Sequence, residues 1–101
     1  MTNNRYIKGR AAEYQIIHRL MDEGWLVFRT AGSHGMFDII ALDSENIRLI
    51  QVKAVAGRGA GYSKKEESFI KNLAVPDNVS KEIWVKKPRK EWVVNVFEKL
   101  D

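Results

Sequence analysis

The first part of the chain carries apolar residues at the spacing of an α-helix. They recur three and four positions apart, at Ala12, Ile16, Ile17, Leu20 and Met21. Residues at this spacing share one face of a helix, and a glycine such as Gly24 commonly follows the last helical turn. The pattern predicts an amphipathic helix from about Ile7 to Glu23.

Three short segments that are rich in β-forming residues follow this helix. They span residues 25–30, 37–43 and 47–54, and their β-branched and aromatic content favours strands. The polar sequence Asp43-Ser44-Glu45-Asn46 lies between the last two segments and predicts a turn that pairs them as an antiparallel hairpin. In that hairpin we expect Asp38 to lie opposite Gln51 or Val52.

The second half of the chain predicts one more helix and two more strands. Glycines at positions 57, 59 and 61 indicate an irregular loop, and Ser63 with Glu66 forms a capping box for a helix that ends near Leu73. Segments 82–86 and 92–97 are rich in β-formers and predict strands. The resulting order, αβββαββ, predicts an α/β fold in which helices flank a mixed central β-sheet.

Length and composition limit the classes of protein that remain. A chain of 101 residues predicts one domain, residues 1–101,. The 17 basic and 13 acidic residues give a net charge of +4, which fits an anionic partner without requiring one. The chain has no cysteine, which excludes disulfides, thiolate catalysis and cysteine-based zinc sites.

The sequence shows neither a membrane segment nor a nucleotide-binding loop. Its apolar runs, such as residues 39–42, are too short to cross a bilayer, and we expect a cytoplasmic protein, in the host cytoplasm if it is viral. The glycine-rich segment 57–61 lacks the Gly-x-x-x-x-Gly-Lys-Ser/Thr pattern, so we expect no nucleotide cofactor,.

Polar residues interrupt the apolar hairpin at three positions. Asp38 begins the first strand, and Gln51 and Lys53 lie two residues apart on the second, which puts both on one face,. A carboxylate, an amide oxygen and an ammonium brought together are what a magnesium-dependent phosphodiester-cleaving site requires. The alternative is that Gln51 and Lys53 simply face solvent on an alternating strand, and the residue pattern leaves it open.

These residues resemble the active-site layout of the restriction-endonuclease-like superfamily, often written PD-(D/E)XK. In that layout a helical glutamate, an aspartate at the head of a strand and a polar-x-Lys motif on the next strand correspond to Glu13, Asp38 and Gln51-Val52-Lys53. Segments 8–10 (Lys-Gly-Arg) and 29–33 (Arg-Thr-Ala-Gly-Ser) make the chain most similar to the archaeal-type Holliday-junction resolvases (Hjc-like) and their viral relatives. The resemblance covers roughly residues 6–97 and implies a restriction-endonuclease-like core.

The resemblance also implies a metal-dependent, structure-selective DNA endonuclease that resolves four-way junctions by paired phosphodiester hydrolysis. Its cofactor would be Mg²⁺, with Mn²⁺ as an alternative, and the implied metal ligands are Glu13, Asp38, Gln51 and the Val52 carbonyl. The implied catalytic residues are Glu13, Asp38, Gln51, Lys53, Arg29 and Ser33. Two departures stand out, since Gln51 replaces an acidic ligand with a neutral one and Phe37 replaces a proline. We expect the first to weaken binding of a hard cation.

The implied partner is branched or duplex DNA. Basic and hydroxyl residues that we expect to contact its backbone flank the predicted site, namely Arg5, Lys8, Arg10, Arg29, Ser33, Arg58, Lys64 and Lys65,. Paired cutting requires two active sites, which implies a homodimer. A candidate interface is Phe69, Ile70 and Leu73 with Trp84 or Trp92, although these residues could equally be buried inside the monomer. The basic run near residues 86–90 we expect to be a solvated turn.

Two other functions remain compatible with the sequence. A different nuclease of the same superfamily, of homing or nicking type, would share the catalytic residues and differ in substrate. A catalytically silent nucleic-acid-binding module would keep the basic residues while Gln51 abolished metal binding. An adaptor domain that does not bind DNA is a third and weaker alternative.

Overall fold

The protein folds into five strands and two helices, described in a computed structural model over residues 4–30, 36–55, 59–88 and 92–97, with the backbone alone for residues 4–9. The elements, in chain order, are α1 (Asn4–Asp22), β1 (Leu26–Arg29), β2 (Ile39–Leu42), β3 (Ile47–Ala54), α2 (Lys64–Asn72), β4 (Val79–Lys86) and β5 (Trp92–Phe97). This order is the predicted αβββαββ, and the α/β prediction with a mixed sheet is confirmed.

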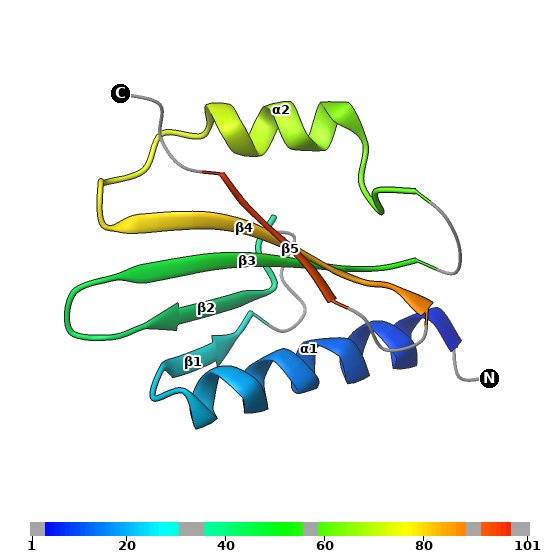
Figure 1. Ribbon diagram of the computed structural model, residues 1–101, viewed down its shortest axis with the longest axis horizontal. Helices are drawn as coiled ribbons and strands as arrows, with labels where there is room; N and C mark the ends of the chain where they lie inside the picture. Colours follow the sequence, from blue (N-terminus) through cyan, green and yellow to red (C-terminus); the bar gives the residue numbers. More distant parts are fainter. Residues whose placement is uncertain (1–3, 31–35, 56–58, 89–91, 98–101) are drawn as a thin grey trace.

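The strands form one sheet in the order β1-β2-β3-β4-β5. Strands β3 and β4 run parallel, and the other neighbouring pairs are antiparallel. In the β2–β3 hairpin Ile39 pairs with Ile50, which puts Asp38 level with Gln51, as the turn sequence predicted. The parallel pair is central, and α2 lies in the connection between its strands (Figure 1).

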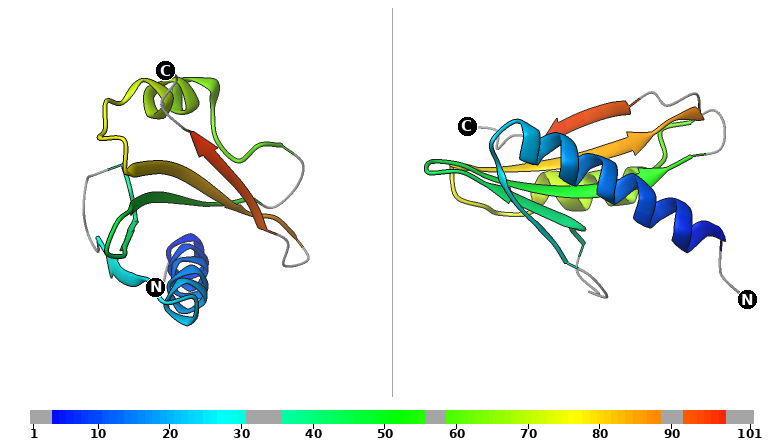
Figure 2. Two further views of the ribbon diagram at one scale, coloured as in Figure 1. Left: turned by 60° about the vertical axis from the view of Figure 1, so that its left-hand side comes forward. Right: turned by 90° about the horizontal axis from the view of Figure 1, so that it is seen from below.

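The two helices cover opposite faces of the sheet, as the turned view shows (left panel of Figure 2). On the α1 face, Ile16 and Leu20 pack against Ile50 and Trp84, with Trp92 partly buried beside them. On the α2 face, Ile70 packs with Ile83, Val85 and Phe97. Trp84 and Trp92 therefore pack in the core of the monomer, which is one of the two alternatives that the sequence left open. Neither described helix is long and apolar enough to cross a membrane.

Several boundaries differ from the prediction. Helix α1 begins at Asn4, and β4 begins at Val79, three residues before the predicted start at Glu82. The early residues of β4 belong to the sheet because β4 pairs with β3 along the whole length of both strands. Lys81 lies in that stretch and is only 1% exposed, so its charge hid the buried start of the strand from the sequence pattern.

Glycine at position 61 allows the chain to enter α2 close to the sheet. Its φ is +88°, and a Cβ atom there would lie 2.7 Å from a side-chain methyl of Val85 and 2.9 Å from one of Val55. Any larger residue would push the start of α2 away from β3 and β4.

Buried Lys81 ties β4 to the end of α2. Its Nζ donates to the carbonyl oxygens of Lys71 and Leu73, both at 2.9 Å. Carbonyl groups in the last turn of a helix lack partners within the helix, and a cation there also interacts favourably with the helix dipole. Lys81 therefore replaces the glycine cap that α2 lacks.

We expect Lys81→Met to lower the free energy of unfolding by about 2 kcal/mol, because it leaves two carbonyl groups without their donor in a closed environment. Urea denaturation followed by circular dichroism measures the change. Lys65→Met, at an exposed position on α2, serves as the control and should alter stability by less than about 0.5 kcal/mol. Equal effects of the two substitutions would contradict the capping role.

A second buried polar group lies on the α1 face. The guanidinium of Arg48 donates twice to the carboxylate of Glu82, with both bonds at 2.8 Å. The Ser80 hydroxyl and the Trp84 indole donate to the same carboxylate at 2.7 and 2.9 Å. The Arg48 guanidinium also lies 5.0 Å from the centre of the Trp25 ring. This network joins β3 and β4 and brings Arg48 against Trp25, the residue before β1.

Candidate active site

Asp38 lies immediately before β2, at the point where that strand begins to pair with β3. Its backbone N–H donates to the Ile50 carbonyl at 2.9 Å, which fixes the residue level with Gln51. Its carboxylate oxygen Oδ2 accepts the Val52 N–H at 2.8 Å. The side chain is thus held against the edge of β3. A carboxylate can accept more bonds than this one, because each of its two oxygens has two lone pairs.

Alternation along β3 separates its side chains between the two faces of the sheet. Ile50 and Val52 pack with the core of the α1 face, so Gln51 and Lys53 share the α2 face. The amide oxygen of Gln51 is shielded from solvent and has no hydrogen-bond partner. Gln51 therefore does not simply face solvent, and the alternative that the sequence left open is wrong for this residue.

The backbone of Val52 faces the same edge as Asp38. The N–H and C=O groups of one strand residue point to the same neighbouring side. Since the Val52 N–H reaches Asp38, the Val52 carbonyl also points toward the side from which Asp38 approaches.

Glu13 and Arg29 form an ion pair on the α1 face. Arg29 Nε donates to Glu13 Oε2 at 3.0 Å, and the two side chains are 19% and 16% exposed. Arg29 ends β1, and Glu13 lies in the middle of α1. The glutamate that sequence alone would assign to the helix surface is therefore largely covered and paired.

Charged residues from both faces of the sheet affect the pKa of Asp38. Burial raises the pKa of its carboxyl above the usual value, and the Val52 N–H opposes this effect. The negative charge of Glu13 raises the same pKa further, while the positive charges of Lys53 and Arg29 lower it. Four of the predicted catalytic residues therefore interact electrostatically at one position, which is the arrangement that catalytic sites commonly show.

The donor atoms at this edge suit a hard divalent cation. They are all oxygens, provided by the Asp38 and Glu13 carboxylates, the Gln51 amide and the Val52 carbonyl, and Mg²⁺ prefers such donors. The Gln51 oxygen is buried without a partner, and a cation is one partner that would satisfy it. No three His, Cys, Asp or Glu side chains in the described residues are placed to hold a metal, so neutral oxygens are needed to complete a ligand set.

The residues predicted to bind DNA are only partly described. Arg10 is exposed on α1 with its guanidinium 5.7 Å from the Tyr14 ring centre. Lys64 and Lys65 are exposed at the start of α2. Ser33 and Arg58 lie outside the described residues, and so do the side chains of Arg5 and Lys8.

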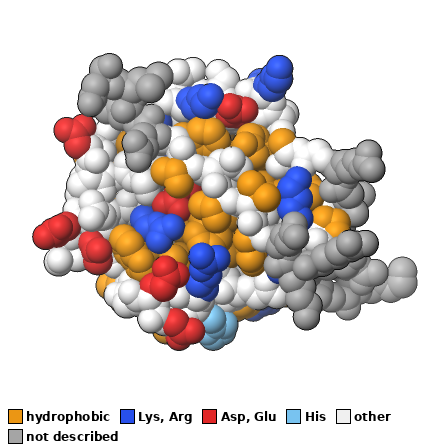
Figure 3. Space-filling model, in the orientation of Figure 1, with side chains coloured by type: hydrophobic (Ala, Val, Ile, Leu, Met, Phe, Trp, Pro, Cys, Tyr) orange, Lys and Arg blue, Asp and Glu red, His pale blue; other side chains and the backbone are white. Residues whose placement is uncertain are grey.

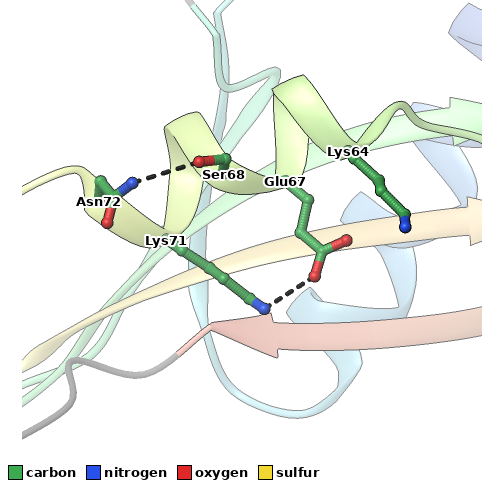
Figure 4. Close-up of a pocket in the computed structure, with 5 residues that line it drawn as sticks. All are labelled: Lys64, Glu67, Ser68, Lys71 and Asn72. Atoms are coloured by element: carbon green, nitrogen blue, oxygen red, sulfur yellow. Dashed lines mark hydrogen bonds and ion pairs between the residues drawn. The ribbon is translucent and has the colours of Figure 1, made fainter.

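A shallow hollow lies along the side of α2 that faces β5 (Figure 4). It is lined by Lys64, Glu67, Ser68, Lys71 and Asn72, which lie along one side of the helix (Figure 4). Glu67 and Lys71 form an exposed ion pair at 2.8 Å. Apart from Lys64, none of these residues belongs to the predicted site.

One contact of the site was missed by sequence reasoning. Glu66, predicted only as part of a capping box, lies 3.0 Å from Lys53 through its carboxylate oxygen. Sequence spacing could not reveal this contact, because the docking of α2 on the sheet creates it. Lys86 was predicted both as the last residue of a strand and as part of a basic turn; it belongs to β4, pairs with Ala54 at the end of β3 and lies over the Trp92 ring.

Comparison with known proteins places this chain in one family. Residues 4–101 match the family model described as archaeal Holliday junction resolvase (Hjc). No curated protein matches the chain at a significant level. Among the solved structures that match is the Holliday junction resolvase Hjc of the archaeal hyperthermophile Archaeoglobus fulgidus, with a TM-score of 0.69 and 24% sequence identity, covering 86% of this chain and 70% of that one. The chain therefore belongs to the archaeal Holliday junction resolvase (Hjc) family, a family of endonucleases.

Proposed function

We propose that this protein is a metal-dependent, structure-selective DNA endonuclease that resolves four-way junctions by paired phosphodiester hydrolysis, with residues 1–101 acting as one nuclease domain. The observation that carries the proposal is the buried, unpartnered amide oxygen of Gln51 beside the Asp38 carboxylate that the Val52 N–H holds in place. A structural hairpin gains nothing from such an orphaned oxygen, which costs free energy.

The proposed roles follow from the position of each group. Asp38, the Gln51 oxygen and the Val52 carbonyl would hold Mg²⁺ or Mn²⁺, and Glu13 would reach the same ion directly or through water. When bound, the cation supplies a water of lowered pKa and neutralises charge on the phosphate. Lys53 would orient the attacking water or stabilise the transition state.

Arg29 would bind a phosphate oxygen at the scissile position, together with Ser33. Its guanidinium is already held by Glu13 in the site, which limits its rotamers and prepares it for the phosphate. Arg5, Lys8, Arg10, Arg58, Lys64 and Lys65 would contact the backbone further along the arms of the DNA.

Paired cutting requires two sites, so we propose a homodimer. Of the candidate interface residues, Ile70 and Trp84 are buried inside the monomer, which is the alternative that the sequence left open, whereas Phe69 is 56% exposed. Val94 and Val96 of β5 are also exposed. They lie on the α1 face of the sheet, on which α1 itself contacts β1, β2 and β3. Hydrophobic side chains gather on this side of the molecule (Figure 3), and this apolar surface supports self-association.

Cleavage of a synthetic four-way junction in Mg²⁺ or Mn²⁺ tests the proposal. We expect symmetric nicks in two opposed strands, little cutting of linear duplex or flap DNA, and a dimeric mass by light scattering at micromolar concentration. Equal cutting of all substrates would favour a nicking or homing-type nuclease. Binding without cleavage in either metal would favour a silent DNA-binding module and overturn the proposal.

We expect Gln51→Glu to tighten Mg²⁺ binding by about tenfold, because a charged oxygen is a better ligand for a hard cation than an amide. Isothermal titration calorimetry of the metal with the DNA-free protein measures the effect. Gln15→Glu adds the same charge at an exposed position of α1 and should leave the affinity nearly unchanged. If both substitutions had equal effects, net charge rather than ligation would be responsible.

A further inference from the structure

Glu66 connects the first turn of α2 to the candidate active site. Ser63 is the N-cap of α2, and its hydroxyl accepts the backbone N–H of Glu66 at 3.1 Å. The Glu66 carboxylate lies with its Oε2 3.0 Å from Lys53 Nζ, and the two side chains are 36% and 28% exposed. The capping residue thus fixes the backbone from which Glu66 reaches Lys53.

The Lys53–Glu66 pair is partly exposed, but one of its oxygen atoms is shielded. Glu66 Oε2 is closed to solvent and accepts no hydrogen bond, although Lys53 Nζ lies 3.0 Å from it. The adjacent Glu67 pairs with Lys71 one turn further along the helix, and those side chains are 33% and 56% exposed. A partly exposed ion pair contributes little to stability, so stability alone does not explain the placement of Glu66.

Gln51 and Lys53 share the α2 face, and Glu66 brings a carboxylate to that face beside Lys53. Glu66 does not join Glu13 and Asp38 in one cluster, because no three such side chains among the described residues could hold a metal together. Its direct contact is with Lys53, through which any effect on the reaction would pass.

We propose that Glu66 is a positioning residue for Lys53, holding the ammonium on the α2 face at the edge of β3 where Asp38 lies. The proposal rests on the nuclease function proposed above. It adds a residue from α2 to a site otherwise built from α1, β1, β2 and β3. A lysine has a long flexible side chain, and a fixed carboxylate 3.0 Å from its end reduces the number of positions that the ammonium adopts before DNA binds.

The pairing can be tested without metal, DNA or activity. Lysine acylation by an N-hydroxysuccinimide ester, followed residue by residue with mass spectrometry, reports how well each ammonium is shielded. We expect Glu66→Gln to increase the acylation rate of Lys53 by about threefold, the factor that an ion pair of this exposure is worth. Lys64 and Lys65, exposed on the same helix, should be unaffected. Glu67→Gln is the matched control and should leave Lys53 unchanged.

The positioning role is tested by single-turnover cleavage of the four-way junction. We expect Glu66→Gln to slow cleavage by about tenfold, as a misplaced catalytic group does, with junction affinity and thermal melting close to those of the wild type. Glu66→Asp should restore part of the rate. In a Lys53→Ala background, Glu66→Gln should have no further effect, because the group that it positions is gone.

Each outcome separates this proposal from the nuclease function. An unchanged Lys53 acylation rate in Glu66→Gln would overturn the pairing whether or not the protein cleaves DNA. Equal slowing of cleavage by Glu66→Gln with and without Lys53 would reject the positioning role while the nuclease function stands. A wild-type protein that cleaves no DNA in either metal would overturn the nuclease function and with it the positioning role, and acylation would then decide the pairing alone.

Discussion

Asp38→Asn should abolish junction cleavage, lowering the rate by about a thousandfold or more, because it removes the charged oxygen at the centre of the proposed metal site. Asparagine is nearly isosteric and can still accept the Val52 N–H, so the fold should be kept. Single-turnover cleavage in Mg²⁺ and in Mn²⁺ measures the loss, and junction affinity in the absence of metal should change little. Residual cleavage within tenfold of the wild-type rate would contradict the ligand role.

Because the pKa of Asp38 is raised, the cleavage rate should depend on pH. Burial and the charge of Glu13 favour the protonated carboxyl, and a protonated carboxyl is a poor metal ligand. As the pH is lowered, the loss of cleavage should therefore begin at a higher pH than it would with an aspartate of ordinary pKa. Glu13→Gln should slow cleavage because it removes a proposed ligand, and the acidic limb of the remaining cleavage should lie at lower pH, because the substitution also removes a negative charge that raises the pKa of Asp38.

Asp38→Asn should also stabilise the metal-free protein near neutral pH. A carboxyl whose pKa is higher in the folded than in the unfolded state contributes stability at low pH, and this contribution is lost as the pH rises through the folded pKa. Asp38→Asn removes the cost of ionisation, so its melting temperature without metal should exceed that of the wild type. Asp43→Asn is the control at the turn of the same hairpin, where backbone N–H groups of Glu45 and Asn46 lower the pKa of the carboxyl, and no such gain is expected.

Glu82→Leu should produce the largest loss of stability, about 3–5 kcal/mol, because it leaves the Arg48 guanidinium partly buried without its counter-charge. Ser80 and Trp84 lose their acceptor in the same change. Urea denaturation followed by circular dichroism measures the loss. A destabilisation below about 1 kcal/mol would show that Arg48 reaches solvent when unpaired.

Replacing both charged partners separates the value of the ion pair from the cost of breaking it. The double variant Arg48→Met, Glu82→Leu should recover much of the lost stability, because two apolar side chains need no partner. If the double variant is no more stable than Glu82→Leu, the pair itself contributes net stability.

The pH dependence of stability provides a second measurement on Glu82. Burial opposes ionisation of its carboxyl, but the hydrogen bonds from Arg48, Ser80 and Trp84 outweigh this effect and lower its pKa. A lowered pKa contributes stability above the unfolded value of about 4.3, and this contribution is lost as the pH falls through the folded pKa. The wild type should therefore lose stability more steeply than Glu82→Leu in this acidic range.

Local sequence determined most of the elements and the core of the proposed site. Helical periodicity defined α1, and the polar turn at residues 43–46 fixed the hairpin register that puts Asp38 level with Gln51. These are short-range effects, since turn chemistry and side-chain alternation act over a few residues. For this reason Asp38, Gln51 and Lys53 could be named together before the fold was known.

Tertiary structure decided the contacts that cross between distant elements. The parallel pairing of β3 with β4 buries Lys81 and Glu82, and both residues appear in the sequence as solvent-facing charges. Sequence spacing also gave no sign that Glu66 would contact Lys53 or that Glu13 would pair with Arg29. Such contacts depend on how α1 and α2 dock on the two faces of the sheet, which is set by the packing of the whole core and not by any local pattern.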